Sequence, residues 1–551
     1  MPLAKNDIIP NVEITDIGEG GVGIGHADGL ALFVRHALPG DIVTARITKV
    51  KKTYAYARIE SLDTPSPHRV PSFCAVSGRC GGCQLTELSY EAELDFKHKK
   101  VRDSLARIGG FPESVLSEAE LPILPSPETL HYRNKAQYPV AIREGHILSG
   151  FYAPHSHTVI PTGECSLVPP LFADILQCIL QFLEEEGISV YDENTGSGLV
   201  RHILIRQARA SGEIQVLPVI NGKSLPGAEE LIGRLKAFPG FTSLSVSVNK
   251  EQSNVILGKT CKTLYGPDKI TDTLTLADTA LRFQISPLSF YQVNSLQTGR
   301  LYETALSFAG LTGSETVWDL YCGIGTISLF LAKQAATVTG IEENPAAVRD
   351  ARENAALNRI SNTEFFAGKA EEVLLDKKLP APDVIMVDPP RAGLMEQVTA
   401  ALTKVSPKRI VYVSCNPATL ARDVKALCDG GYELKRFRPV DMFPRTTHVE
   451  TVCLLSKLSE AKNHISVKVD MDEMDLTAAE SKATYQEIKE WVKEKYGFHV
   501  SHLNIAKTKR KCGIIERKNY NLPKNEDSRS PETPKEKEEA ITEAFRHFQM
   551  I

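Results

Sequence analysis

The feature that most constrains this chain is a regular alternation of apolar and amphipathic segments over residues 290–458. Helical stretches separate four apolar runs that have the length of buried strands: 316–322, 336–342, 383–390 and 409–415. Such alternation is typical of a parallel, doubly wound sheet with helices on both faces. Two later runs, 434–444 and 448–458, are too close in sequence for a helical crossover, so we predict an antiparallel pair there.

The other parts of the chain differ in composition and in their pattern of strands and helices, and we predict a multidomain α/β protein. Residues 1–62 contain five short strands, a pattern that favours a small closed, OB-like barrel of the kind that binds oligonucleotides. Residues 63–288 open with a proline-rich linker and mix strands and helices, which indicates an α+β central domain with a helix over 90–108. Residues 289–458 then form the Rossmann-like sheet.

Residues 459–551 are a polar, charged C-terminal extension to which we assign no role. We predict a helix over 484–497 and a partly disordered segment over 530–545. The extension is either an RNA-binding appendage or a solvated tail, and six basic residues keep the first alternative open: Lys507, Lys509, Arg510, Lys511, Arg517 and Lys518.

Charge and hydropathy limit the classes of partner. Lys and Arg number 64 against 68 Asp and Glu, a net charge of −4, so any site for a polyanion must be a local patch. No apolar run approaches the ~18 residues of a membrane span, and the first residues lack an apolar signal core. Eleven cysteines are too few for a secreted disulfide scaffold. We therefore expect a cytoplasmic monomer with no membrane association.

One such local patch lies at the end of the predicted barrel. Cations for phosphates and rings for bases alternate in this stretch: Lys49, Lys51, Lys52, Tyr54, Tyr56 and Arg58. The pattern fits a surface for RNA, and it fits equally an exposed strand with solvated lysines.

A glycine-containing loop follows the first strand of the sheet, at Asp319–Thr326. Gly323 and Gly325 permit a tight turn and a close approach of a ligand. Glu342 stands 19 residues after Gly323, about the spacing at which a carboxylate reaches ribose hydroxyls. A dinucleotide fingerprint would have a third glycine where this chain has Ser328, so S-adenosylmethionine fits better than NAD.

Three further segments follow strand ends, where ligands of such sheets bind. In Asp388-Pro-Pro-Arg391 the prolines hold the loop rigid, and an arginine in place of an aromatic residue argues against methylation of an amino group. Cys415 precedes a predicted helix N-terminus, an environment that lowers the pKa of a thiol. Glu450 lies in an otherwise apolar strand. A nucleophile and a base beside a methyl donor suit uracil, whose C5 becomes nucleophilic when a thiolate adds to C6.

Four cysteines indicate a metal site. Cys74, Cys80 and Cys83 are closely spaced, and Cys165 lies far downstream. Four thiolates can hold zinc or an iron–sulfur cluster, and the glycines at 81 and 82 let the backbone fold tightly around a bulky group.

Together these motifs resemble those of the RNA uracil-C5 methyltransferases, over about residues 5–458. The signatures are Ser289–Asn294, Asp319–Thr326, Asp388–Gly393, Ser414–Pro417 and His448–Glu450. The resemblance implies that the barrel is a TRAM domain and that the cysteine set holds a [4Fe–4S] cluster. It also implies that Cys415 is the nucleophile and Glu450 the base, and that S-adenosylmethionine is held by Gln292, Tyr321, Glu342 and Asp388.

Members that carry both the barrel and the cluster resemble mostly enzymes that act on large-subunit (23S) ribosomal RNA, which is therefore the expected substrate. Transfer RNA is the alternative, since some relatives with a cluster modify it. A non-catalytic RNA-binding protein is the alternative from another class. The presence of both Cys415 and Glu450 argues against it.

Overall fold

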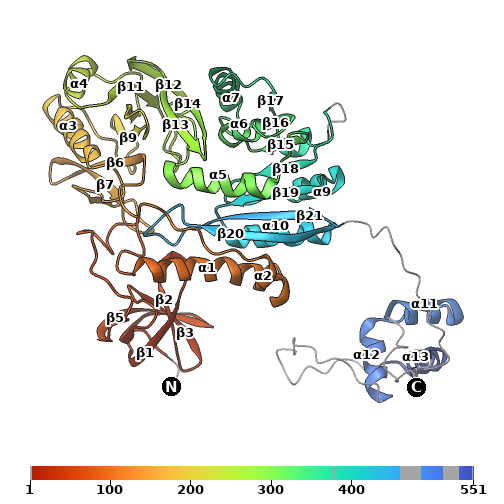
Figure 1. Ribbon diagram of the computed structural model, residues 1–551. Coiled ribbons are helices and arrows are strands. Elements are labelled where there is room, and N and C mark those ends of the chain that lie inside the picture. The colour runs from red at the N-terminus through yellow and green to blue at the C-terminus, as the bar shows by residue number, and fades with distance from the viewer. Residues whose placement is uncertain (1–2, 376–378, 459–484, 513–532, 549, 551) are drawn as a thin grey trace. The chain divides into compact units, whose positions relative to one another are not determined.

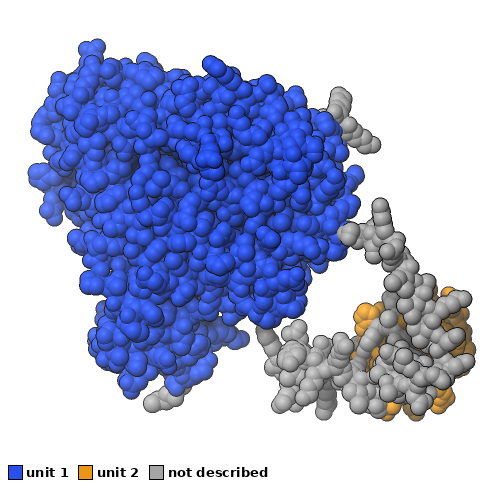
Figure 2. All heavy atoms as spheres, viewed as in Figure 1, with its two compact units in different colours: residues 1–459 blue, residues 460–551 orange. Residues whose placement is uncertain are grey.

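The computed structural model describes residues 3–375, 379–458, 485–512, 533–548 and 550. The chain divides into two compact units, residues 1–459 and 460–551 (Figure 2). No helix within the described ranges is long and apolar enough to cross a membrane. The first unit contains a closed barrel, two seven-stranded sheets and a two-stranded hairpin (Figure 1).

The N-terminal strands close into a five-stranded barrel in the order β1-β2-β3-β5-β4, as predicted. Its elements are β1 (Ile8–Ile17), η1 (Glu19–Gly21), β2 (Gly23–Ala27), β3 (Leu30–Arg35), β4 (Ile42–Val50) and β5 (Tyr54–Thr64). Alternate residues of β4 point inward: Val43, Ala45 and Ile47 are fully buried. These alternate side chains fill the barrel interior, and their period of two is the pattern that identified the strand in the sequence.

The central part begins with two helices, α1 (Tyr90–Arg107) and α2 (Glu113–Ala119), and α1 confirms the predicted helix. Its sheet has the order β12-β11-β10-β9-β6-β7-β8. The strands are β6 (Lys135–Arg143), β7 (His146–Tyr152), β8 (Val159–Pro161), β9 (Val200–Gln207), β10 (Ile214–Ile220), β11 (Phe241–Val248) and β12 (Thr260–Tyr265). Helices α3 (Leu171–Glu185) and α4 (Ala228–Leu235) bury their apolar residues against it.

The predicted doubly wound sheet is present, in the order β17-β16-β15-β18-β19-β21-β20. Its strands are β15 (Thr316–Leu320), β16 (Thr337–Glu342), β17 (Thr363–Ala367), β18 (Val384–Val387), β19 (Arg409–Ser414), β20 (Tyr432–Val440) and β21 (Glu450–Lys457). Neighbours from β17 to β19 are parallel, and β21 is antiparallel to both β19 and β20, which confirms the predicted pair. The strand order reverses between β15 and β18, the point at which such sheets bind ligands.

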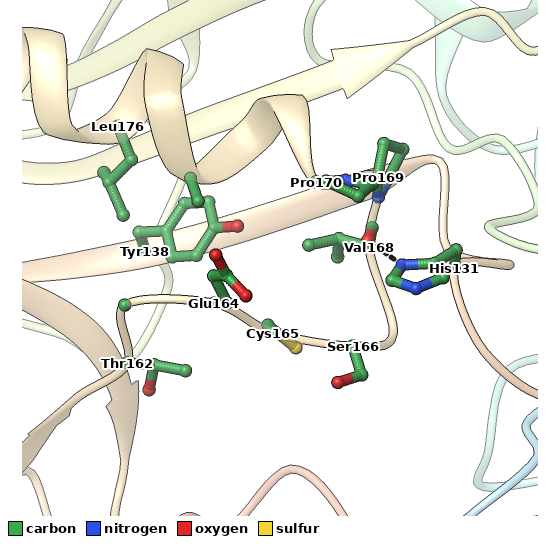
Figure 3. Close-up of a pocket in the computed structure, with 12 residues that line it drawn as sticks. His131, Tyr138, Thr162, Glu164, Cys165, Ser166, Val168, Pro169, Pro170 and Leu176 are labelled. Atoms are coloured by element: carbon green, nitrogen blue, oxygen red, sulfur yellow. Dashed lines mark hydrogen bonds between the residues drawn. The ribbon is translucent and has the colours of Figure 1, made fainter. Parts of the chain in front are cut away.

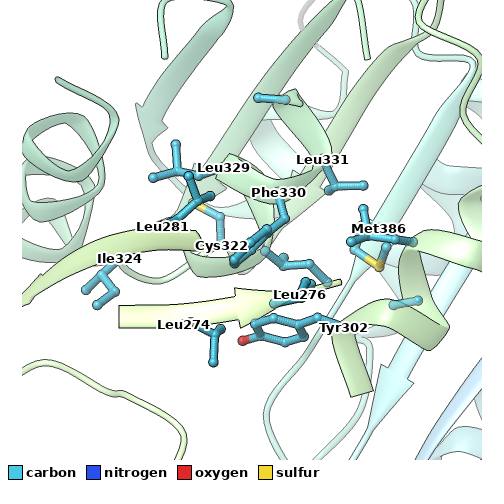
Figure 4. Close-up of a cluster of buried hydrophobic side chains, with 14 of the residues drawn as sticks. Leu274, Leu276, Leu281, Tyr302, Cys322, Ile324, Leu329, Phe330, Leu331 and Met386 are labelled. Carbon is cyan, nitrogen blue, oxygen red and sulfur yellow. The ribbon is translucent and has the colours of Figure 1, made fainter. Parts of the chain in front are cut away.

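Two apolar layers cover this sheet. The helices are α5 (Ser295–Ala309), α6 (Thr326–Ala332), α7 (Pro345–Leu357), α8 (Ala370–Val373), α9 (Glu396–Val405) and α10 (Pro417–Asp429). Helices α5, α6 and α7 pack on one face together with the hairpin β13 (Ile270–Leu276) and β14 (Thr279–Ile285), whose leucines meet Tyr302, Phe330 and Met386 in one core (Figure 4). Helices α1, α9 and α10 cover the other face.

The second unit contains three described helices, α11 (Tyr485–Tyr496), α12 (His502–Lys511) and α13 (Lys535–His547). Helix α11 confirms the predicted one. The prediction of a partly disordered segment over 530–545 is wrong for its C-terminal part, because Ile541 and Phe545 lie one helical turn apart and are buried against α11 and α12. Charged residues outnumber the apolar ones in α13, so this narrow apolar stripe is not evident from composition. Arg517 and Lys518 lie outside the described residues.

Candidate active site

The loop after β15 and the end of β16 meet at the carboxyl edge of the sheet. Gly323 and Gly325 have φ angles of 56° and 82°, in the left-handed region that favours glycine. The N–H of Gly323 donates to Glu342 Oε2 at 3.2 Å. Tyr321 adopts φ 65°, a value uncommon outside glycine. The predicted juxtaposition of the glycine loop with Glu342 is therefore present.

Two aspartates lie behind this loop. Asp319 is fully buried, its Oδ2 accepts a hydrogen bond from Ser328, and its Oδ1 has no partner within the described residues. Ser328, which replaces the third glycine of a dinucleotide fingerprint, thus binds this acid. Asp388 follows β18 at the strand-order reversal, and its N–H donates to Leu320 O at 3.4 Å. Burial raises the pKa of both carboxyls to about 7.

Helix α5 contributes a tyrosine that the sequence analysis missed. The Tyr302 hydroxyl is 3.0 Å from Thr326 Oγ1. Burial raises the pKa of this phenol, and so do the nearby charges of Asp388, Asp319 and Glu450. No sequence motif marks this residue, because only the packing of α5 against the sheet brings it to the acids.

Gln292 lies in the loop that leads into α5 and is 9% exposed. Its backbone carbonyl accepts a 2.9 Å hydrogen bond from Asn134 Nδ2. Its side-chain amide makes no hydrogen bond to any described residue. The segment around Gln292 is therefore anchored to the central domain.

Cys415 and Glu450 come together through strand register. Ser414 lies opposite Thr451 in the antiparallel pair of β19 and β21, so Cys415, which follows Ser414, and Glu450, which precedes Thr451, lie at the same edge of the sheet. Glu450 is 4% exposed, and its carboxyl has no hydrogen bond or ion pair with any described residue. Burial raises its pKa to about 8, the charge of Asp388 adds to this, and Arg391 opposes it. A buried, unpaired carboxyl beside a thiol suits a general base.

The expectation of a lowered thiol pKa at Cys415 is wrong. The residue does precede helix α10, whose N-cap is Asn416. Burial nevertheless raises the pKa of Cys415 to about 11, and the charges of Glu450 and Asp388 add to the effect, while Arg391 lowers it. Desolvation and two neighbouring acids outweigh one helix terminus, so the thiol is protonated at neutral pH.

Arg391 links the three loops of the site. One Nη of its guanidinium lies 2.9 Å from His448 Nδ1, and its carbonyl accepts hydrogen bonds from Asn416 Nδ2 and Thr419 Oγ1. Burial lowers the pKa of His448 to about 4, and the cation Arg391 lowers it further, so a neutral ring accepts from the guanidinium. The sequence analysis used Arg391 only to exclude amino-group methylation and missed this role.

The four predicted metal-ligating cysteines, Cys74, Cys80, Cys83 and Cys165, line one cavity of about 240 Å³. Arg133 and Lys135 line it too. Figure 3 shows Cys165 on the loop between Thr162 and Ser166, which the 131–133 segment holds through hydrogen bonds such as His131 Nδ1 to Val168 O at 2.8 Å. No group of three or more His, Cys, Asp or Glu in the described ranges is arranged to hold a metal ion, so the structure does not support the predicted cluster directly.

A groove of about 460 Å³ lies between the barrel, α1 and the start of α10, and the residue that follows Cys415 in the chain is part of its lining. Asn416, Pro417 and Ala418 form one end of it. Residues of the barrel and of α1 form the rest: Asp16, Ile17, Gly18, Glu19, Ile24, Phe96, Lys99, Lys100, Asp103, Ser104, Arg107 and Ile108.

The sheet order and the glycine loop with Glu342 beside it are typical of S-adenosylmethionine-dependent methyltransferases, and comparisons with known proteins specify the family. A model described as tRNA (Uracil-5-)-methyltransferase matches residues 243–458, and a TRAM domain model matches residues 10–59. An uncharacterized RNA methyltransferase of Halalkalibacterium halodurans is 45% identical over 458 residues, 82% of this chain and 98% of that protein. One from Caldanaerobacter subterraneus is 44% identical over 451 residues, 81% of this chain and 98% of that protein.

A solved structure agrees with these matches. The crystal structure of the Pyrococcus abyssi tRNA (uracil-54, C5)-methyltransferase, in complex with S-adenosyl-L-homocysteine, is similar with a TM-score of 0.64 and 31% identity. The alignment covers 81% of this chain and 99% of that one. The chain belongs to the S-adenosylmethionine-dependent RNA uracil-5-methyltransferase family, and its barrel is a TRAM domain.

Proposed function

We propose that this enzyme methylates C5 of a uridine in ribosomal RNA through a covalent adduct between Cys415 and C6 of the base, and that it acts as a monomer. The observation that carries the proposal is the pairing of β19 with β21, which brings a thiol and an unpaired buried carboxyl to one edge. A thiol, a base and a methyl donor in one site are what C5 methylation of uracil requires.

In the proposed reaction Cys415 and Glu450 act at different steps. The Cys415 thiol first loses its proton to solvent water. The resulting thiolate then forms a C–S bond at C6, while the electron pair of the C5–C6 double bond moves to C5 and makes it nucleophilic. S-Adenosylmethionine, when bound, supplies the electrophilic methyl group that C5 takes. Glu450 then removes the C5 proton, the electrons of that C–H bond restore the double bond, and the C–S bond breaks to free Cys415.

The cofactor would be held where the sheet order reverses. The proposed contacts are Gln292, Tyr321, Glu342 and Asp388. Glu342 lies beside the Gly323 N–H, as a ribose-binding carboxylate should, and Asp319 Oδ1 is a buried acceptor with no partner among the described residues. Carboxyl groups around the methyl position suit a positively charged sulfonium, so the residues present fit this cofactor.

RNA would bind along the groove beside Cys415 and on the barrel. Phe33, Tyr54 and Tyr56 form a ring cluster on the barrel with centroids 5.4–5.8 Å apart, and Tyr56 is 40% exposed. Lys51 and Lys52 lie exposed in the adjacent turn. Exposed rings next to cations are the pattern of single-strand binding on such barrels.

Ribosomal RNA is proposed because family members with both the barrel and the cysteine set resemble mostly enzymes that act on large-subunit ribosomal RNA. Transfer RNA is the second candidate, favoured by the solved Pyrococcus abyssi relative, which is a tRNA (uracil-54, C5)-methyltransferase. Mass-spectrometric mapping of 5-methyluridine in 23S and transfer RNA from a strain lacking the gene separates the two. One 23S site should lose its methyl group and regain it with the wild-type gene but not with Cys415→Ala. Loss confined to transfer RNA would refute the ribosomal target.

We also propose that the four cysteines hold a [4Fe–4S] cluster. Their cavity is larger than a single ion needs, and Arg133 and Lys135 on its wall would offset the negative charge of four thiolates. Protein purified without oxygen should be brown and contain about four irons per chain. Cys165→Ser should lose the iron, whereas Cys178→Ser, outside the cavity, should keep it. Stoichiometric zinc without visible absorbance would refute the cluster.

A further inference from the structure

A second cavity, of about 460 Å³, lies in the central domain and shares no residue with the candidate active site. It borders strands β7 and β9 and the loop after α3. The residues that give it chemical character are Tyr152, His157, Tyr191, Glu193, Arg201 and His202. Its volume is within the range of small-ligand sites, and the proposed reaction leaves it without a role.

The walls of this cavity offer flat surfaces. The rings of Tyr152 and His157 are stacked, with centroids 5.3 Å apart and 29° between their planes. On another wall the Arg201 guanidinium lies 4.4 Å from the centroid of Tyr191. Aromatic rings and guanidinium planes are the surfaces on which unpaired RNA bases stack.

Two buried polar side chains bordering the cavity have an atom with no partner in the described parts of the chain. Arg201 donates through Nη1 to Asn249 O and Glu251 O, yet its Nε is unpaired. His202 is 3.3 Å from the Tyr152 hydroxyl through Nε2, and its Nδ1 is unpaired. Each residue is 5% exposed. Buried polar atoms normally have partners, so a pair of exceptions at one cavity points to an absent ligand.

The rim of the cavity is acidic. Asp192 and Glu193 lie on the loop beside Asn194, and Glu193 accepts hydrogen bonds from His157 and Tyr152. Two carboxylates repel a phosphate but accept hydrogen bonds from a base that carries N–H groups on its pairing edge. Guanine presents two adjacent donors, N1–H and the N2 amino group, together with the O6 and N7 acceptors that arginine reads. Adenine presents an acceptor at N1, which a carboxylate repels.

We propose that this cavity binds an unpaired guanine of the substrate RNA, outside the target uridine; the inference rests on the proposed function. The place of the cavity supports a role in positioning RNA. The carbonyl of Tyr152 accepts a 2.9 Å hydrogen bond from the Gly81 N–H, within the loop that carries Cys80 and Cys83. The guanine site is thus joined through the backbone to the cysteine loop beside the barrel.

The test uses the full chain and 12-nucleotide single-stranded RNAs with one guanosine, inosine or adenosine in a uridine background. The guanosine strand should bind about 10-fold more tightly than the adenosine strand, and inosine, which lacks the N2 amino group, should lie between them. Tyr152→Leu should abolish this difference through loss of the stacking face. Tyr265→Leu, a ring stacked on Phe241 in the same sheet but outside the cavity, should leave it unchanged.

A second measurement needs no variant. RNA that carries 6-thioguanosine is cross-linked to the wild-type protein, and the modified peptides are identified by mass spectrometry. Cross-links at Tyr152, His157 or Tyr191 support the proposal. Cross-links elsewhere only, equal affinity for all three strands, or free GMP binding as tightly as the guanosine strand would each overturn it. Methylation of total RNA is assayed in parallel: its absence counts against the proposed function, not against the guanine site.

Discussion

Two groups of buried charges in the first unit are built in opposite ways. Beneath α1, Lys97 Nζ donates to Glu93 Oε1 at 2.7 Å and to Asp441 Oδ1 at 2.6 Å, and all three side chains are fully buried. At the sheet edge, the buried Glu450 and the partly exposed Asp388 are acids whose carboxyls have no hydrogen bond or ion pair in the described ranges. One group is paired, and the other is not.

The difference shows what each group is for. The paired group fixes the 441–449 loop that leads into β21: Lys97 also donates to Phe443 O, and the Arg445 N–H donates to Glu93 Oε1. Such a network stabilises a single arrangement as long as every member is present. Unpaired buried acids reduce stability and shift their own pKa values, which is the usual signature of a reactive site.

The largest effect is expected for Cys415→Ala. Without the thiolate C5 is never activated, so turnover should fall by at least about 10⁴-fold, with no covalent protein–RNA adduct. RNA affinity and melting temperature should stay close to wild type. Gel electrophoresis under denaturing conditions and methyl transfer from labelled cofactor measure these outcomes, and residual turnover would rule out the covalent mechanism.

Glu450→Gln should have opposite effects on activity and stability. Turnover should drop about 10²–10⁴-fold with accumulation of a methylated adduct, because the base that removes the C5 proton is missing. Stability should rise by about 1–3 kcal/mol, since an unpaired buried carboxyl is removed.

This stability gain should depend on pH. The pKa of Glu450, raised to about 8, exceeds that of an unfolded glutamate, about 4.3, so the wild type loses stability as pH rises between these values. The melting-temperature difference between Glu450→Gln and wild type should therefore grow from pH 5 to pH 8. A difference independent of pH would contradict the raised pKa.

Lys97→Met breaks the paired group and removes the lysine cation shared by two buried carboxylates, which should cost about 3–5 kcal/mol of stability, measured by urea unfolding. Lys99→Met is the matched control, because Lys99 on the same helix pairs with Asp16 and Asp103 while half exposed. That variant should lose less than about 1 kcal/mol. Equal losses would mean that burial does not decide the strength of these pairs.

The electrostatics of the thiol give a finer test. The charge of Glu450 raises the pKa of Cys415 and that of Arg391 lowers it. Alkylation of Cys415 by iodoacetamide should thus begin at lower pH in Glu450→Gln and at higher pH in Arg391→Met. Arg391→Lys should keep most of the wild-type dependence of alkylation on pH, because lysine retains the positive charge. A purely steric role of Arg391 would predict no such rescue.

The smallest effect is expected on the barrel. Replacing both Lys51 and Lys52 by Ala should weaken RNA binding and reduce its salt dependence, because about two phosphate contacts are lost. Affinity for S-adenosylmethionine should not change. RNA binding that is insensitive to salt and to both lysines would mean that the barrel does not contact RNA.

The order of elements was predictable from local patterns. A period of two identified the barrel strands, and apolar runs separated by helical stretches identified the parallel sheet, because both patterns depend on which face of each element is buried. Glu342 could be placed beside the glycine loop because only one helix and one strand separate them along the chain. The apolar stripe of α13 escaped detection because charged residues outnumber its buried positions.

The sequence by itself determined the fold class, the family and the residue types available for chemistry, since these follow from periodicity and from motifs a few residues long. Only the tertiary structure decided the ionisation of those residues. The raised pKa of Cys415, the contact of Arg391 with His448 and the approach of Tyr302 to the acids arise between segments far apart in the chain. Desolvation and Coulomb energy depend on three-dimensional distance and burial, which no local pattern encodes.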